Sequence, residues 1–132
     1  MDYNISTNTY LVRLTLEGTP QIDSLVQALN ECSSFVNQNH HNLLFIDGSQ
    51  LACPFDITDK YSIITKLGEL GFSRKTQIVV VTSSSHFERN TLETMGYNRG
   101  WSINTFKKLH EAKDWIDAYI DINNVENQMK VC

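Results

Sequence analysis

Two short, wholly apolar segments constrain the fold of this chain more than any other feature of its sequence. Residues 43–46 and 78–81 contain only leucine, isoleucine, valine and phenylalanine, so both faces of each predicted strand are apolar. Such strands are typical of a parallel sheet that is covered on both sides. They alternate with longer segments whose apolar residues recur at helical spacing. This alternation predicts an α/β fold with a mostly parallel sheet.

The sheet is expected to extend beyond these two strands. Residues 10–17 alternate between apolar and partly polar positions, which predicts a strand near a sheet edge. Residues 3–6 predict a short strand that pairs with it, and residues 101–106 predict the last strand. The first helix is expected to begin with Thr19 as its N-cap and Pro20 as its first residue, where the missing N–H costs nothing.

Three more helices are predicted. The second covers residues 58–70 and stops at Gly71. The third begins at a capping box, in which Ser85 accepts a bond from the amide three residues later, and it ends near Met95 with Gly96 behind it. The inward faces expected of the second and last helices consist of Tyr61, Ile64 and Leu67, and of Leu109, Ala112, Trp115, Ile116 and Tyr119.

The length and composition suit a single domain. The chain has 132 residues and is 41% hydrophobic, as globular proteins are. We expect one domain over residues 1–122, followed by a polar, loosely held tail over residues 123–132. No apolar run approaches the about 20 residues that a membrane helix needs. Residues 1–8 have neither the basic start nor the apolar stretch of a secretory signal.

The cysteines and the net charge bear on location and partners. Three cysteines without an export signal indicate free thiols and a cytoplasmic protein. Cys32 lies on the apolar face of the first helix and is expected in the core. Cys53 is expected in an apolar plug between Ala52 and Phe55. The net charge of −4 disfavours a nucleic-acid partner.

The candidate functional surface is the edge where the parallel strands end. Ligands of open α/β sheets bind at that edge, which comprises residues 47–55, residues 82–89 and the turn after Phe106. The sequence contains no phosphate loop, dinucleotide fingerprint, zinc-binding helix or nucleophile elbow. We therefore expect no cofactor and no metal.

Asp47 follows the first of the two apolar strands and allows two interpretations. In one, its side chain caps the following turn. In the other, it is the phosphoacceptor of a receiver-like domain, or the centre of an enzyme, with Thr82 and Lys107 or Lys108 at the ends of later strands. Phosphoryl transfer of that kind also needs an acidic cluster that holds Mg²⁺.

The hydroxyl-rich segment that leads into the third helix is the second candidate. Its candidate ligand- or partner-binding residues are Ser83, Ser84, His86 and Arg89. They precede or enter a helix N-terminus, where free N–H groups favour an anion. Ser84 and His86 also suggest a catalytic trio with Asp47, which only geometry can establish. In the simplest interpretation Ser85 caps the helix and His86 is a solvated surface histidine.

Several segments together indicate a family. They are residues 14–18 (LTLEG), 43–47 (LLFID) and 78–81 (IVVV), and Phe106 followed by residues 111–116 (EAKDWI). In order and spacing, over about residues 10–119, the chain resembles the SpoIIAA-like branch of the STAS (anti-sigma-factor-antagonist-like) domains. The resemblance implies a four- or five-stranded mixed, mostly parallel sheet with about four helices, packed mainly on one face.

The resemblance also implies a non-catalytic regulatory or binding role, with a protein partner or a small anionic ligand. Some STAS-like domains are switched by phosphorylation of a serine after the central strand, within an Asp-Ser-Ser-Gly-like motif. Here the sequence is Asp47-Gly48-Ser49, so Ser49 is the corresponding candidate and the second serine is absent. Other STAS-like domains hold apolar ligands such as lipids between sheet and helices, which is an alternative function.

Overall fold

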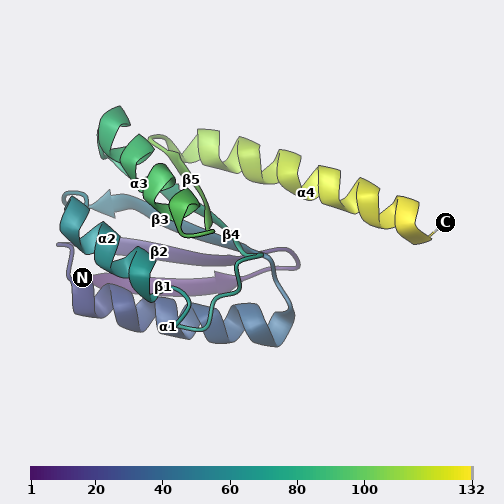
Figure 1. Cartoon of the computed structure of the whole chain (residues 1–132), viewed down its shortest axis with the longest axis horizontal. Helices are drawn as coiled ribbons and strands as arrows, with labels where there is room; N and C mark the ends of the chain where they lie inside the picture. Colours follow the sequence, from purple (N-terminus) through teal and green to yellow (C-terminus); the bar gives the residue numbers. More distant parts are fainter. Residues whose placement is uncertain (132) are drawn as a thin grey trace.

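The computed structural model describes residues 1–131, and the side chains of residues 1–123. The elements follow in the order β1 (Asp2–Thr7), β2 (Val12–Gly18), α1 (Ile22–Asn39), β3 (Leu43–Leu51), α2 (Ile57–Lys66), β4 (Gln77–Val81), α3 (His86–Asn98), β5 (Ser102–Phe106) and α4 (Leu109–Val131) (Figure 1). The strands form one sheet in the order β1-β2-β3-β4-β5. Only the β1–β2 pair is antiparallel. The predicted mixed, mostly parallel α/β fold is confirmed.

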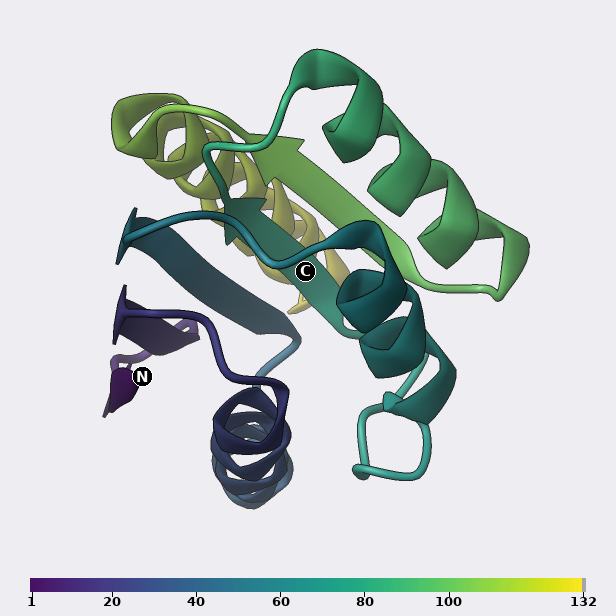
Figure 2. The same ribbon diagram turned by 90° about the vertical axis from the view of Figure 1, so that its left-hand side faces the viewer.

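The strand order explains where the helices lie. Each parallel strand is followed by its neighbour in the sheet, so the three crossovers advance in the same direction. Because such crossovers are right-handed, α1, α2 and α3 must lie on the same face. Helix α4 follows the last strand and covers the opposite face (Figure 2).

Two hydrophobic clusters fill the layers on either side of the sheet. The larger one lies beneath α1, α2 and α3 and contains Leu14, Leu29, Leu44, Ile64, Leu92 and Ile103, among others. The smaller one lies beneath α4 and contains Leu43, Phe45, Val79, Val81, Ala112 and Ile116. Strands β3 and β4 contribute to both clusters, which explains why each is apolar on both faces.

The first helix begins later than predicted. Strand β2 continues to Gly18, whose carbonyl accepts a hydrogen bond from the Ala52 amide at 2.8 Å. The chain therefore turns into α1 only at Gln21, which is the N-cap residue and makes no side-chain cap. Thr19 and Pro20 lie in the connection, so the prediction of a Thr19 cap is wrong.

The second helix is shorter than predicted, and one of its inward residues points outward. Helix α2 ends at Lys66, and turns lead to Gly71, whose φ of +102° marks the predicted stop. Ile64 and Leu67 are buried as predicted, but Tyr61 is 46% exposed. The Tyr61 hydroxyl accepts a hydrogen bond from Arg99 Nη2 at 2.7 Å.

The third helix does not end before Gly96. The Ser85 hydroxyl accepts the Glu88 amide at 3.2 Å, which confirms the predicted N-cap. Gly96 lies inside α3 and packs on β5, because a Cβ at this position would lie 2.6 Å from Ile103 Cδ1. The glycine therefore permits close helix–sheet contact, and α3 continues to Asn98.

The C-terminal segment is helical where a loose tail was predicted. Helix α4 continues past Tyr119 to Val131. No glycine or proline follows Gly100, so nothing in the sequence breaks the helix where its apolar face ends. A domain boundary after residue 122 stays a prediction. None of the described helices is both long and apolar enough to span a bilayer.

The two described cysteines differ in exposure. Cys32 is fully buried, as predicted, and burial followed by the nearby Glu31 charge raises its pKa to about 12. Cys53 is exposed. The predicted apolar plug is therefore wrong for Cys53, since only Phe55 of that segment reaches the core. Cys132 lies outside the described residues.

We predict that Gly96→Ala destabilises the protein by about 1–3 kcal/mol, because the methyl group overpacks against Ile103. Intrinsic helix propensity alone predicts the opposite, namely that alanine raises the free energy of unfolding by up to about 1 kcal/mol. Urea denaturation measures the difference, with Thr94→Ala at an exposed position of the same helix as the control. Ile103→Val removes the contacting methyl and should reduce the cost of Gly96→Ala. An equal cost in both backgrounds would contradict the contact.

Iodoacetamide should modify Cys53 in the folded protein and leave Cys32 unmodified, because only Cys53 is exposed. Peptide mapping by mass spectrometry identifies the modified thiol. Equal labelling of both residues without denaturant would contradict the burial of Cys32.

Candidate functional site

The parallel strands bring the predicted segments to one edge of the sheet. Asp47 pairs in register with Val81, and Val81 pairs with Phe106. The Thr82 amide also donates to the Phe106 carbonyl at 2.9 Å. The three segments that follow these strands therefore meet at this edge, as the crossover argument predicted.

Strand β3 does not end at Asp47, because a bulge carries it further. Thr15 pairs with Asp47, but Glu17 pairs with Gln50, so β3 contains one extra residue between these pairs. The Asp47 Oδ1 atom accepts the Ser49 amide at 3.0 Å. The carboxylate thus satisfies an N–H group beside the irregularity, and β3 continues to Leu51.

Gly48 is the residue of this bulge that must be small. A Cβ at Gly48 would lie 2.8 Å from the Val81 carbonyl oxygen, which belongs to the backbone of the neighbouring strand. The close approach leaves no room for a side chain. Asp47-Gly48-Ser49 is therefore part of a strand bulge, and the predicted turn at the strand end is wrong.

Asp47 is also held by an ion pair. Its Oδ2 atom accepts Arg13 Nη2 at 2.9 Å, and the Asp47 side chain is only 4% exposed. Arg13 also lies over the Phe45 ring, with 5.2 Å between its Cζ and the ring centroid. Burial raises the pKa of Asp47, but Ser49 and then Arg13 lower it more, so the net pKa is below 3.8. Both carboxylate oxygens thus have structural partners.

The predicted trio of Asp47, Ser84 and His86 is not joined in the structure. Asp47 bonds to Arg13 and Ser49, whereas Ser84 bonds to Thr82 and to Lys60. Successive residues of a strand point to opposite faces of the sheet. Asp47 therefore lies on the same face as Leu43 and Phe45, which α4 covers, whereas Gly48 lines the cavity on the opposite face, beneath α2 and α3. His86 is exposed at the first position of α3.

The other predicted residues divide into exposed and buried groups. Ser49, Ser83 and His86 are exposed to solvent. Arg89 is half-buried, and its Nε atom is buried with no hydrogen-bond partner among the described residues. Phe87 is 78% exposed, although it is a large apolar side chain. Across the side chains of residues 1–123, no three His, Cys, Asp or Glu groups come together as a metal site.

Thr82, Ser84 and Lys60 form a hydrogen-bonded polar cluster. Ser84 is 2% exposed, and its hydroxyl lies 3.0 Å from that of Thr82. Lys60 of α2 donates to the same Ser84 hydroxyl at 2.5 Å. Burial lowers the pKa of Lys60, while the nearby Glu88 and Asp56 charges act in the opposite direction. The lysine thus ties α2 to the connection between β4 and α3.

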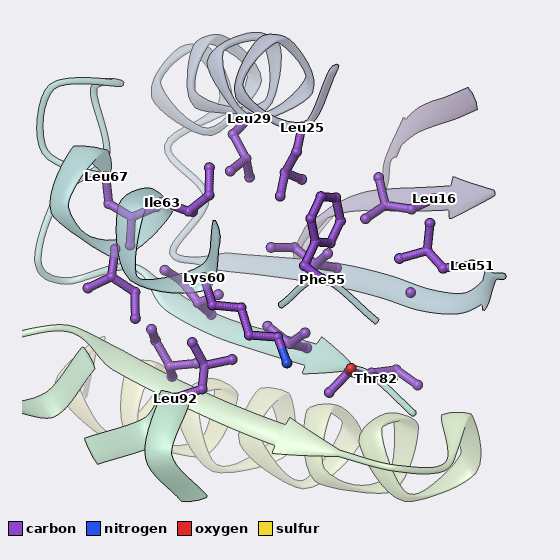
Figure 3. A pocket seen from close by; sticks show the side chains of 17 residues that line it. Leu16, Leu25, Leu29, Leu51, Phe55, Lys60, Ile63, Leu67, Thr82 and Leu92 are labelled. Atoms are coloured by element: carbon purple, nitrogen blue, oxygen red, sulfur yellow. The ribbon is translucent and has the colours of Figure 1, made fainter. Parts of the chain in front are cut away.

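This cluster borders a cavity of about 100 Å³ between the sheet and the three helices (Figure 3). Leu25 and Leu29 come from α1, and Ile63 and Ile64 come from α2. Phe55 lines the cavity from the connection between β3 and α2. Apart from Lys60 and Thr82, the lining side chains are apolar.

The sequence analysis missed Arg13 and Lys60. Lys60 lies four and seven residues before Ile64 and Leu67, on the apolar stripe of α2, and this spacing could have identified it. Arg13 could not be paired with Asp47 from the sequence, because the pairing depends on the strand register.

The fold is shared with two solved structures. One is the crystal structure of an anti-sigma factor antagonist from Mycobacterium paratuberculosis, with a TM-score of 0.52 and 14% identity over 88% of this chain and 93% of that chain. The other is the anti-sigma factor antagonist SpoIIAA in its unphosphorylated form, with a TM-score of 0.55 and 12% identity over 88% and 98%. No family model and no curated protein matches the sequence. At these identities the likeness concerns the fold, and the chain has the SpoIIAA-like STAS fold.

We predict that Arg13→Met destabilises the protein by about 1–3 kcal/mol, because it leaves the buried Asp47 carboxylate without its cation. The value lies below that of a fully buried pair because the Arg13 side chain is 33% exposed. Chemical denaturation at neutral pH measures the loss. An unchanged stability would contradict the structural role of the pair.

The same pair predicts a dependence on pH. The lowered pKa of Asp47 means that its stabilising contribution is complete above the ordinary value of 3.8 and is lost as the pH falls through the folded-state value. The stability difference between the wild type and Asp47→Asn should therefore shrink below pH 3.8. Denaturation at several pH values tests this, with Asp114→Asn as an exposed-carboxylate control. A constant difference would contradict it.

Proposed function

We propose that this chain is a non-catalytic regulatory STAS-type module that binds a protein partner. The observation that carries the proposal is the likeness of fold to two anti-sigma factor antagonists, over 88% of this chain in both cases. Both Asp47 carboxylate oxygens accept hydrogen bonds from the protein itself, which supports a non-catalytic role for that residue. The three cysteines support a cytoplasmic location, since the exposed Cys53 thiol fits a reducing compartment.

We place the partner at the edge surface, defined by Ser49, Ser83, His86 and Phe87. All four residues are exposed: Ser49 lies near the end of β3, and Ser83, His86 and Phe87 follow β4 at the same edge of the sheet. Phe87 supplies an aromatic side chain with polar neighbours, and aromatic anchors surrounded by a polar rim are typical of protein interfaces. The rigid sheet and the capped start of α3 position this anchor.

Ser49 is the residue through which we propose that binding is switched. It is exposed, and its amide is held by Asp47, so the backbone that presents its hydroxyl is fixed. A phosphoryl group there would add a charge of about −2 beside an acidic side chain, and it would repel an acidic or apolar partner surface. One of the two structural neighbours is described in its unphosphorylated form.

Affinity capture with matched variants tests this proposal. Phe87→Ser and Ser49→Asp should each lose the captured partner, whereas Ser49→Ala should retain it. Tyr97→Ser is the matched control, because Tyr97 is 80% exposed near the other end of α3. The proposed surface would be wrong if Tyr97→Ser lost the partner while Phe87→Ser kept it.

The phosphoacceptor and enzyme alternatives predict different results. With acetyl phosphate and Mg²⁺ we expect no adduct in the intact mass, because Asp47 is 3% exposed and both its oxygens are bonded. An adduct on the wild type that Asp47→Asn lacks would replace the proposal. Turnover of an ester or phosphate panel that is lost in Ser84→Ala or His86→Ala would also contradict it.

The small size of the cavity argues against the lipid-carrier alternative. Pockets for drug-sized ligands measure roughly 300–1,000 Å³, and this cavity measures about 100 Å³. Native mass spectrometry of freshly purified protein should therefore show no lipid adduct.

A further inference from the structure

The cavity beneath α1, α2 and α3 is lined by apolar side chains and by one amine, that of Lys60. The Lys60 side chain runs across it from α2, and its nitrogen lies near Thr82 at the end of β4 (Figure 3). An apolar space with one cationic group at its border matches a molecule with a compact apolar group and one negative charge.

The middle of the sheet is left partly uncovered at this cavity. Ile46 and Val80 are paired in register on the two central strands and line the cavity. Both are only half-buried, although Leu44 and Ile78, two residues earlier on the same strands, are buried. The helices therefore leave apolar surface in the centre of the sheet that an apolar group of matching size could cover.

The Lys60 ammonium group lacks a carboxylate partner in the structure. Its hydrogen bond goes to the neutral Ser84 hydroxyl. Among the side chains of residues 1–123, the salt bridge is the one between Arg13 and Asp47. Burial lowers the pKa of the half-buried Lys60, and the nearby Glu88 and Asp56 charges, which are not within salt-bridge distance, offset this only in part. A carboxylate at the border of the cavity would compensate this charge.

Neighbouring hydroxyl groups would complete the contact. Thr82 lines the cavity, and its hydroxyl lies 3.0 Å from that of Ser84, which already accepts from Lys60. A hydroxyl can donate as well as accept. Lys60 and Thr82 can therefore donate to one carboxylate, and charge-assisted bonds of this type are the stronger ones.

We propose that the cavity binds a small monocarboxylate, with its carboxylate on Lys60 and Thr82 and its apolar group against Ile46 and Val80. A cavity of about 150 Å³ holds benzene, so a cavity of about 100 Å³ takes an apolar group smaller than benzene, of roughly four or five carbons. This site is distinct from the proposed edge surface and does not depend on a protein partner.

Titration of the isotope-labelled full chain with hexanoate, followed by NMR, tests the site. Hexanoate should bind saturably and shift the amide signals of Ile46, Val80 and Lys60. Acetate lacks the apolar group and should not bind, and 1-hexanol should bind at least about tenfold more weakly, a difference of ~1.4 kcal/mol. Equal binding of hexanoate and 1-hexanol, or no saturable binding of hexanoate, would overturn the proposal.

Variants test the contribution of the Lys60 charge and that of the cavity volume separately. Lys60→Met keeps an apolar stem and should abolish the preference for hexanoate over 1-hexanol. Lys66→Met removes an exposed lysine from the same helix and should leave that preference unchanged. Val80→Phe fills the cavity and should weaken both ligands, and Ile63→Phe does so from α2 if Val80→Phe does not fold. An unchanged preference in folded Lys60→Met would overturn the assignment of Lys60.

Discussion

The carboxylate of Asp47 holds the central strand in the shape on which the candidate site depends. It satisfies the Ser49 amide beside the bulge and pairs with Arg13 of the neighbouring strand. Because of the bulge, β3 continues in register with β2 to Leu51. The chain then returns over the sheet through Phe55, which reaches the core and lines the cavity. Helix α2, and with it Lys60, is positioned from there.

The order of the strands determines what lies above the sheet. Four successive strands run parallel as neighbours, so three crossover helices share one face. These three helices surround the cavity, which Leu29, Ile64 and Leu92 line from α1, α2 and α3. On the other face α4 covers mainly β4 and β5. The same topology brings the strand ends to one edge, where the Lys60–Ser84 contact ties α2 to the connection between β4 and α3.

Much of the fold could be predicted from the sequence, because burial determines residue type. The wholly apolar segments at β3 and β4 indicate a sheet covered on both faces, and the Ser85 cap indicates the start of α3. The errors arose where a tertiary contact overrides a local pattern. Asp47-Gly48 is typical of a turn, but the strand continues because Asp47 bonds to Ser49. Gly96 resembles a helix end, but it lies within α3 because Ile103 needs the space.

The candidate site was predicted only in part. The edge of the sheet follows from topology, so Ser49, Ser83 and His86 could be placed there from the sequence. The partners of Asp47 and Ser84 could not, because Arg13 and Lys60 approach them from elements far apart in the chain. Register and helix rotation decide those contacts, and neither is encoded in a short motif.

We propose above all that the edge surface of this STAS-type fold binds a protein partner. The most direct measurement is an NMR titration of the isotope-labelled chain with the captured partner. We expect the perturbed amides to cluster at Ser49, Ser83, His86 and Phe87. Perturbations confined to β1 or to the exposed face of α4, with the edge surface unchanged, would contradict it.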